Sequence, residues 1–219
     1  MSAIHDRRMR RFLKAGLYLV TSRSMSAGRT TETIVRAALA GGVRLIQLRG
    51  KELPANEFAA LAHKVRRWTA DGGALLIIND RLDVALAVGA DGVHLGQEDL
   101  PMTAARKMAP DLILGASSHS VSEARDAQRQ GASYVNIGPL FPTKTKAWGR
   151  GFLGLAGLKR ISATITIPFT VMGGIKKSHI RELVAAGAHT IAVVTAVTAA
   201  PNPRLAARDL LAEIRRCRR

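Results

Sequence analysis

The chain has 219 residues, of which 47% are hydrophobic, so it is long enough to bury one large core or two small ones. Its single cysteine, Cys217, excludes a disulfide framework and a cysteine-based zinc site, and we expect a reducing compartment, the cytoplasm. Lysine and arginine total 33 against 16 acidic residues, a formal net charge of +17, which attracts phosphates, nucleic acids and acidic surfaces alike.

Part of this charge lies at the chain ends. We expect a basic N-terminal extension over residues 1–16 and a basic tail over residues 215–219, both solvated. Lys14 interrupts the first apolar stretch and no cleavage site follows, so no signal peptide is predicted. No stretch of the sequence reaches the roughly 20 apolar residues of a membrane span. Aromatic residues make up only 4% of the chain, too few for a surface that stacks single-stranded nucleic acid.

Between the two ends, apolar runs alternate with helical patterns. Strands are predicted at residues 17–21, 43–48, 74–78, 92–95, 112–116, 134–137, 167–172 and 190–194. Helices are predicted over 30–39, 54–68, 101–108, 120–130, 155–162, 178–186 and 203–216, and a further helical span is predicted between Asp80 and Gly92. Eight strand–helix units of uniform composition favour one α/β domain, a (β/α)8 TIM barrel over residues 17–214; a doubly wound sheet is the alternative.

The stretch from Ala74 to Asp99 illustrates the arrangement. Two apolar runs end in polar residues, at Asn79-Asp80 and at the segment that closes with Asp99, and the connection between them is long enough for a helix. Such a crossover joins parallel neighbours, so Asp80 and Asp99 leave the same edge of the sheet. Paired carboxylates suit Mg²⁺, with substrate phosphate oxygens as further ligands. The alternative is that both residues cap the helices that follow them.

In a barrel, all strand C-termini converge on one rim, where active sites lie. Cations, two acids and glycines on one rim describe a site for phosphorylated ligands, although each residue taken singly also fits loop charge, a turn or a cap. The sequence places there Gln47, Arg49, Lys51, Asn79, Asp80, Gln97, Asp99, Ser117, His119, Thr143, Thr145, Lys146, Gly173, Gly174 and Thr195.

Six segments, in order, resemble the thiamine phosphate synthase family: 17–21, 47–51, 78–81, 91–99, 138–146 and 173–175. The most specific are HLGQED at 94–99 and TKTK at 143–146. The resemblance implies a transferase of thiamine biosynthesis that couples hydroxymethylpyrimidine diphosphate to thiazole phosphate with Mg²⁺, releasing thiamine phosphate and pyrophosphate. The implied partners are these small molecules. We expect no membrane and no nucleic acid partner, and a homo-oligomer stays open.

The resemblance also implies roles for individual residues. Asp80 and Asp99 resemble the metal ligands. The residues that resemble the family's pyrimidine and diphosphate contacts are Gln47, Arg49, Lys51, Asn79, Ser117 and Lys146, and the cations Arg49, Lys51 and Lys146 are the catalytic groups that would neutralise the leaving pyrophosphate. The residues that resemble the thiazole phosphate contacts are Thr143, Thr145, Gly174, Val194 and Thr195.

Three places depart from the family's pattern: Ser22 and Gly50, where the family often has an acid, and the loop 147–152. We expect them to affect closure over the substrates and rate rather than the type of reaction. Two other functions stay open. One is the related thiazole tautomerase, which needs no metal and would use His119 as its acid–base group. The other is a non-catalytic basic barrel that binds phosphate or nucleic acid.

Overall fold

Eight parallel strands form a closed barrel in chain order in the computed structural model, which describes residues 2–143, 149 and 151–218. Each strand pairs with the next, and Leu17 of the first lies opposite Ile191 of the last, which closes the ring. The predicted TIM barrel is therefore confirmed, and the doubly wound sheet is excluded. The strands are β1 (Leu17–Val20), β2 (Leu45–Leu48), β3 (Leu75–Asn79), β4 (Gly92–Leu95), β5 (Ile113–Ser118), β6 (Tyr134–Ile137), β7 (Phe169–Val171) and β8 (Thr190–Val193).

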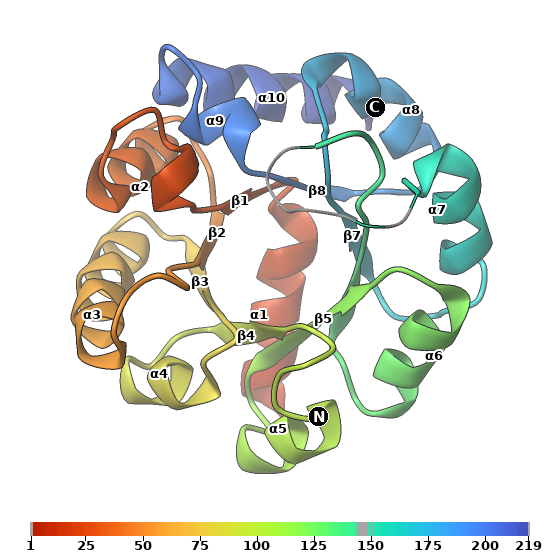
Figure 1. The fold of residues 1–219 in the computed structure, drawn as a ribbon, viewed down its shortest axis with the longest axis horizontal. Helices are drawn as coiled ribbons and strands as arrows, with labels where there is room; N and C mark the ends of the chain where they lie inside the picture. Colours follow the sequence, from red (N-terminus) through yellow and green to blue (C-terminus); the bar gives the residue numbers. More distant parts are fainter. Residues whose placement is uncertain (1, 144–148, 150, 219) are drawn as a thin grey trace.

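The helices that follow the strands surround the barrel (Figure 1). Several begin at a residue whose side chain accepts a hydrogen bond from the first turn, including Thr30, Ser120 and Asn202. The α-helices are α1 (Ala3–Lys14), α2 (Thr31–Ala40), α3 (Ala55–Asp71), α4 (Leu82–Ala87), α5 (Met102–Met108), α6 (Val121–Arg129), α7 (Gly154–Ser162), α8 (Ile180–Ala185), α9 (Thr195–Thr198) and α10 (Pro203–Cys217), with 3-10 turns η1 (Arg23–Met25) and η2 (Lys177–His179).

The strands bury both of their faces, because successive side chains alternate between the interior of the barrel and the layer of helices. The outward residues, such as Leu19, Ile46 and Ile78, pack with the helices in one large apolar cluster. The inward residues form a second cluster that includes Tyr18 and Tyr134. The barrel is therefore a filled core, and only its two ends are open to further structure.

Helix α1 lies at the N-terminal end of the barrel and is seen through the ring of strands in Figure 1. Its Phe12 is fully buried, with its ring centroid 4.5 Å from that of Tyr134 and 6.2 Å from that of Tyr18. The basic side chains Arg7, Arg10, Arg11 and Lys14 are exposed, as expected, but the segment is an ordered helix with a buried face rather than a solvated extension. His5, Met9 and Phe12 recur at helical spacing among the arginines, which gives this basic helix one face to bury.

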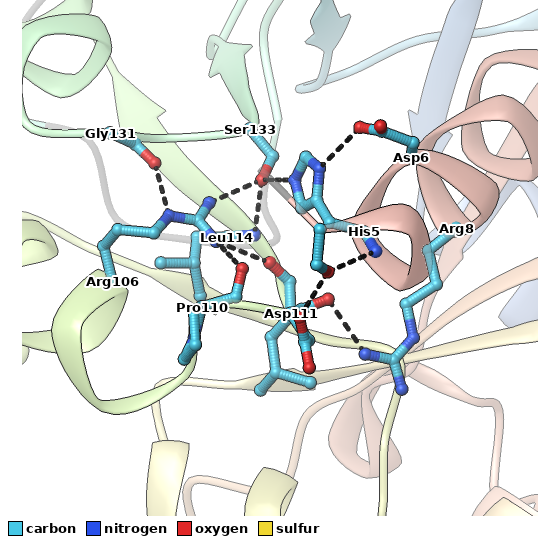
Figure 2. Close-up of polar contacts among 11 residues, drawn as sticks. His5, Asp6, Arg8, Arg106, Pro110, Asp111, Leu114, Gly131 and Ser133 are labelled. Carbon is cyan, nitrogen blue, oxygen red and sulfur yellow. Dashed lines mark hydrogen bonds and ion pairs between the residues drawn. The ribbon is translucent and has the colours of Figure 1, made fainter.

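Polar contacts fasten α1 to the barrel, as Figure 2 shows. Ser133 Oγ accepts from Arg106 Nη2 at 2.8 Å and from the Leu114 backbone N–H at 3.0 Å, which occupies both of its lone pairs. Its own proton is therefore donated to His5 Nε2, 2.9 Å away, so His5 is neutral. Burial and the nearby Arg106 lower the pKa of His5, which agrees with this assignment.

A second set of contacts centres on Asp91, a buried carboxylate at the start of β4. It accepts from Arg66 Nη1 at 2.7 Å and from the Leu76 N–H at 2.9 Å, and Arg8 Nε of α1 lies 3.5 Å from its other oxygen. Arg8 also donates to the Asp111 carbonyl at 2.9 Å, shown in Figure 2. The N-terminal end of the barrel is thus closed by a helix whose Arg8 and His5 Nε2 have partners in the barrel, while the buried His5 Nδ1 lies 3.6 Å from Asp6 Oδ1 and makes no hydrogen bond among the described residues.

The C-terminal segment continues as helix to Cys217, beyond the predicted end at residue 216. Arg216 pairs with Glu213 one turn earlier, and residues 215–217 continue α10, with Arg215 and Arg216 exposed to solvent. Across the described ranges, none of the helices is both long and apolar enough to cross a membrane.

Candidate functional site

Two pockets occupy the C-terminal rim of the barrel. One, the glycine-lined pocket, lies at the ends of β5 to β8, and the predicted residues Ser117, Thr143, Gly174, Val194 and Thr195 line it together with His119. The other lies at the ends of β2 and β3, where Lys51, Asn79 and Asp80 line it with Leu53 and Phe58. The rim residues predicted from the sequence therefore fall into two groups.

Asp80 lines the pocket at the ends of β2 and β3 and has an unusual backbone conformation. Its backbone φ is 62°, a left-handed conformation that is uncommon for residues other than glycine. Its N–H donates to the His94 carbonyl at 2.8 Å, and its carboxylate lies 2.9 Å from Lys51 Nζ. Strained backbone of this kind is concentrated at functional sites, where surrounding structure holds it in place. The strand exit thus turns a carboxylate toward the lysine of the neighbouring strand.

Asp99 lies next to this pair. It accepts a hydrogen bond from the Gly96 N–H at 2.6 Å. Burial raises the pKa of Asp99, and the adjoining Asp80 carboxyl raises it further. Neither aspartate caps a helix, since α4 follows Arg81 and α5 follows Pro101 without a side-chain cap. The capping alternative is therefore wrong, and the two carboxylates meet.

This pair suits a hard divalent cation. Two neighbouring carboxylates repel each other, and Mg²⁺ is commonly held by one or two carboxylates, with water and substrate phosphates as its other ligands. Among the residues that the structure describes, no cluster of three or more histidine, cysteine, aspartate or glutamate side chains could hold a metal without such help. The donor set of Asp80 and Asp99 therefore fits a cation that arrives with a phosphorylated substrate.

The glycine-lined pocket is built on backbone rather than charge. Gly173 and Gly174 follow β7 with φ values of +102° and +64°, and a Cβ at Gly174 would lie 2.3 Å from the Pro142 carbonyl oxygen. Only glycine fits this turn. After β8 the chain passes through Val194 directly into the short helix α9 at Thr195. Loops after strands 7 and 8 that end in a short helix commonly bind phosphate in barrels of this kind.

His119 lines the same pocket. Its Nδ1 donates to the Gly138 carbonyl, and its backbone N–H donates to Glu123 Oε2 at 2.7 Å. The ring is therefore held at the rim between β5 and β6. The sequence indicated this position, because His119 follows Ser117 by two residues at the exit of the fifth predicted strand.

The remaining predicted residues are dispersed. Gln47 is buried and donates from Nε2 to the Tyr18 hydroxyl at 2.7 Å. The Arg49 N–H donates to Thr21 Oγ1 at 3.0 Å, and its side chain is half-buried. Thr145 and Lys146 lie outside the described residues.

The departures from the family pattern have local surroundings. Ser22 is buried beside η1, where its carbonyl accepts from Ser26 Oγ at 2.6 Å. A Cβ at Gly50 would lie 3.0 Å from Phe58 Cδ2, so an acid at this position would require Phe58 to move. Of the loop 147–152, residues 147, 148 and 150 lie outside the described residues.

Sequence reasoning missed several polar groups inside the barrel. Tyr18, His94 and Tyr134 are buried on inward positions of β1, β4 and β6, and Asn136 of β6 lines the glycine-lined pocket. The available signal was a polar or hydroxylated residue within an otherwise apolar strand. That signal gives no partner, because the partners come from other strands.

The comparisons with known proteins agree with this geometry. A family described as thiamine monophosphate synthase matches residues 17–197. The thiamine-phosphate synthase of Moorella thermoacetica is 46% identical over 203 residues, covering 92% of this chain and 97% of that protein. The thiamine-phosphate synthase of Chloroflexus aurantiacus is 43% identical, covering 90% and 91%.

Solved structures give the same result. A thiamine phosphate pyrophosphorylase from Pyrococcus furiosus superposes with a TM-score of 0.86 at 39% identity, covering 93% of this chain and 97% of that one. A 3-hexulose-6-phosphate synthase superposes with a TM-score of 0.69 at 22% identity, covering 90% and 99%, a likeness that concerns the fold alone.

Proposed function

The chain belongs to the thiamine monophosphate synthase family and is a transferase with thiamine-phosphate synthase activity, and we propose that its two rim pockets bind the two substrates. In this proposal hydroxymethylpyrimidine diphosphate places its diphosphate at the Lys51–Asp80 pocket. Thiazole phosphate binds at the glycine-lined pocket, and the pyrimidine ring lies between them.

Charged side chains at the rim support the proposed diphosphate site. Lys51, half-exposed at the rim, pairs with Asp80 and can turn to a phosphate oxygen, and Arg49 on the same strand exit adds a second cation. Mg²⁺ held by Asp80 and Asp99 would supply further positive charge to the diphosphate. Asn79 contributes a buried amide at the same strand end. Lys146, which lies outside the described residues, is proposed as the third cation.

The thiazole end is supported by the backbone at Gly173-Gly174 and by the start of α9. Both turns follow strand ends, and exposed N–H groups there can donate to phosphate oxygens. Thr143 and Thr195 add hydroxyl groups on the walls of this pocket, and Thr145 is proposed to act with them. Pocket walls that are mostly uncharged suit the thiazole ring itself.

The reaction needs little covalent chemistry from the protein. The bond between the pyrimidine methylene carbon and the pyrophosphate oxygen breaks, and its electron pair leaves with pyrophosphate. The aminopyrimidine ring delocalises the positive charge, and the lone pair of the thiazole nitrogen then forms the new C–N bond. No side-chain nucleophile or base is required, so this chain contributes positioning and preorganised charge.

The observation that carries the proposal is the division of the rim into an acidic and cationic pocket beside a glycine-lined one. The test is an assay of the purified protein with both phosphorylated precursors, with and without Mg²⁺. We expect thiamine phosphate and pyrophosphate in equal amounts, and neither product after chelation of the metal. Folded protein that yields neither product with Mg²⁺ present would contradict the proposal.

A matched pair of carboxylate variants sharpens the test. Asp83 lies in the first turn of α4, is exposed and pairs with Arg81, three residues from Asp80. Asp83→Asn should keep the activity, whereas Asp80→Asn should lose it. If the Asp80 variant instead isomerises a tautomeric thiazole phosphate at a rate set by His119, the tautomerase hypothesis would replace the synthase proposal. The cytoplasm stays our proposal for its location, supported by the single cysteine.

A further inference from the structure

A chain of hydrogen bonds crosses the barrel interior beneath the two pockets. Gln47 Nε2 lies 2.7 Å from the Tyr18 hydroxyl, which lies 2.9 Å from the Tyr134 hydroxyl. That hydroxyl lies 2.9 Å from His94 Nδ1, and His94 Nε2 lies 3.0 Å from Ser117 Oγ. Its two ends are residues proposed to hold the pyrimidine, and its three middle members touch no pocket.

The direction of this chain follows from counting protons. The Gln47 amide donates to Tyr18, so the Tyr18 proton needs another acceptor, and the Tyr134 oxygen is the one within reach. Tyr134 must then donate its own proton to His94 Nδ1. His94 therefore carries its proton on Nε2 and donates it to Ser117 Oγ. Every proton of the chain finds an acceptor in this one direction.

The reverse direction leaves a proton without a place. If His94 carried its proton on Nδ1, Tyr134 would donate to Tyr18, whose oxygen already accepts from Gln47. The Tyr18 proton would then be buried without an acceptor, whereas buried polar groups in proteins are nearly always hydrogen-bonded. Tyr18 and Tyr134 are fully buried, so water does not offer a substitute.

We propose that this buried chain sets the polarity of Ser117, so that Ser117 accepts from His94 and presents its own proton to the ligand. The ligand atom above Ser117 is then a hydrogen-bond acceptor. This step rests on the proposed function: the acceptor atom is a ring nitrogen of the aminopyrimidine. Ser117 then discriminates against a ring that offers C–H or N–H at that position. Tyr18, Tyr134 and His94 act as positioning residues.

A further observation supports the assignment. Gly115 of β5 makes room for the contact, because a Cβ there would lie 2.2 Å from Tyr134 Cζ and 2.5 Å from His94 Nδ1. A glycine at position 115 therefore leaves room for the contact between the Tyr134 and His94 rings.

The tautomer of His94 tests the proposal without any substrate. In ¹⁵N-histidine-labelled protein at neutral pH, the His94 signals, identified by their loss in His94→Gln, should show a protonated Nε2 and an unprotonated Nδ1. A protonated Nδ1 would mean that the Gln47 amide is turned over and the chain runs the other way, which overturns the proposal. This result is independent of whether the protein turns over its substrates.

Discrimination between ligands tests the consequence. Pyrimidine diphosphate analogues with C–H in place of either ring nitrogen should include one that binds the wild type about 10- to 100-fold more weakly than the substrate, the range expected for one lost hydrogen bond to a buried group. Ser117→Ala should reduce that ratio to about threefold or less. The control is Ser118→Ala, the neighbouring serine whose hydroxyl donates to the Ser120 carbonyl at 3.0 Å and which should keep the wild-type ratio.

Tyr134→Phe tests the role of the middle of the chain. It should raise the KM for the pyrimidine diphosphate about tenfold while the KM for thiazole phosphate changes less than about twofold. Equal changes in both KM values would indicate a general loss of structure and would contradict a positioning role. Wild-type discrimination retained in Ser117→Ala would likewise overturn the proposal. A wild type without synthase activity but with the Nε2–H tautomer would refute the proposed function and leave the assigned polarity intact.

Discussion

The two ends of the barrel treat polar groups in opposite ways. At the N-terminal end, Ser133 and Asp91 each have several partners, supplied by α1, by the arginines of α3 and α5, and by backbone N–H groups. At the C-terminal end, Asp80 has left-handed backbone and its carboxylate faces that of Asp99. The first arrangement lowers the energy of the folded chain. The second leaves charge and strain that a ligand can relieve, which is how a scaffold separates stability from chemistry.

One nine-residue segment spans this contrast. Asp91 begins it at the closed end, His94 lies in the barrel interior and Asp99 ends it at the open rim. Substitutions along this segment should therefore change stability at one end and catalysis at the other.

The largest expected effect is on catalysis at the open end. Asp99→Asn and Asp80→Asn should each lower kcat/KM by about 10²- to 10³-fold or more, because in the proposed function their charges hold the Mg²⁺ that neutralises the diphosphate. Asparagine tolerates the left-handed backbone of residue 80, so the unfolding free energy should change by less than about 1 kcal/mol. Steady-state kinetics at several Mg²⁺ concentrations and urea unfolding measure the two quantities. Near wild-type turnover at limiting Mg²⁺ would remove these residues from the site.

The next effect is on stability at the closed end. Asp91→Asn removes the charge shared by Arg8 and Arg66, and should lower the unfolding free energy by roughly 3 kcal/mol. The kcat/KM at a temperature where the variant stays folded should match that of the wild type. A loss of activity without a loss of stability would break the comparison.

Ser133→Ala should have a smaller effect at the same end. It leaves Arg106, His5 and the Leu114 N–H each without one partner, and we expect a loss of about 2 kcal/mol in unfolding free energy. Chemical denaturation measures it, and synthase kinetics provide the control, since this residue lies at the opposite end from the pockets. An unchanged midpoint would show that α1 is held by its apolar face alone.

The smallest effect concerns pH. Because the pKa of His5 is lowered from its usual 6.5, the unfolded chain binds more protons than the folded one as the pH falls through that region. The unfolding free energy should therefore decrease as the pH falls below 6.5, and this decrease should be smaller in His5→Gln. His63→Gln, at an exposed position of α3, is the control and should follow the wild type. Identical pH profiles for the His5 variant and the wild type would contradict the neutral assignment.

Much of the fold could be predicted because the barrel repeats one unit. Apolar runs set the strands, and β4 and β6 have the predicted bounds. The meeting of Asp80 and Asp99 followed from parallel neighbours, which fixes the rim without any knowledge of side-chain positions. The sheet boundaries that moved, such as β2 beginning at Leu45 rather than residue 43, lie where strand ends fray into turns.

The parts that could not be predicted depend on contacts distant in sequence. The docking of α1 requires Ser133 and Asp111, which lie more than 100 residues away in the sequence. The arginine-rich composition of this segment predicted a solvated extension, although the residues that α1 buries recur at helical spacing. The buried chain from Gln47 to Ser117 draws on five strands, and no single strand indicates its partners. Local pattern predicts which side chains face inward, while tertiary structure decides what they meet.

The docking of α1 also has a consequence for the order in which the protein is made. Helix α1 is synthesised before all eight strands, yet its partners Asp91, Asp111 and Ser133 follow 83, 103 and 128 residues after the α1 residues that contact them. Until then the nascent chain carries a basic helix with its binding surface still missing. The docking of α1 on the N-terminal end of the barrel is therefore a late, long-range event in folding. The ring of strands is completed only when the last strand, β8, has been synthesised.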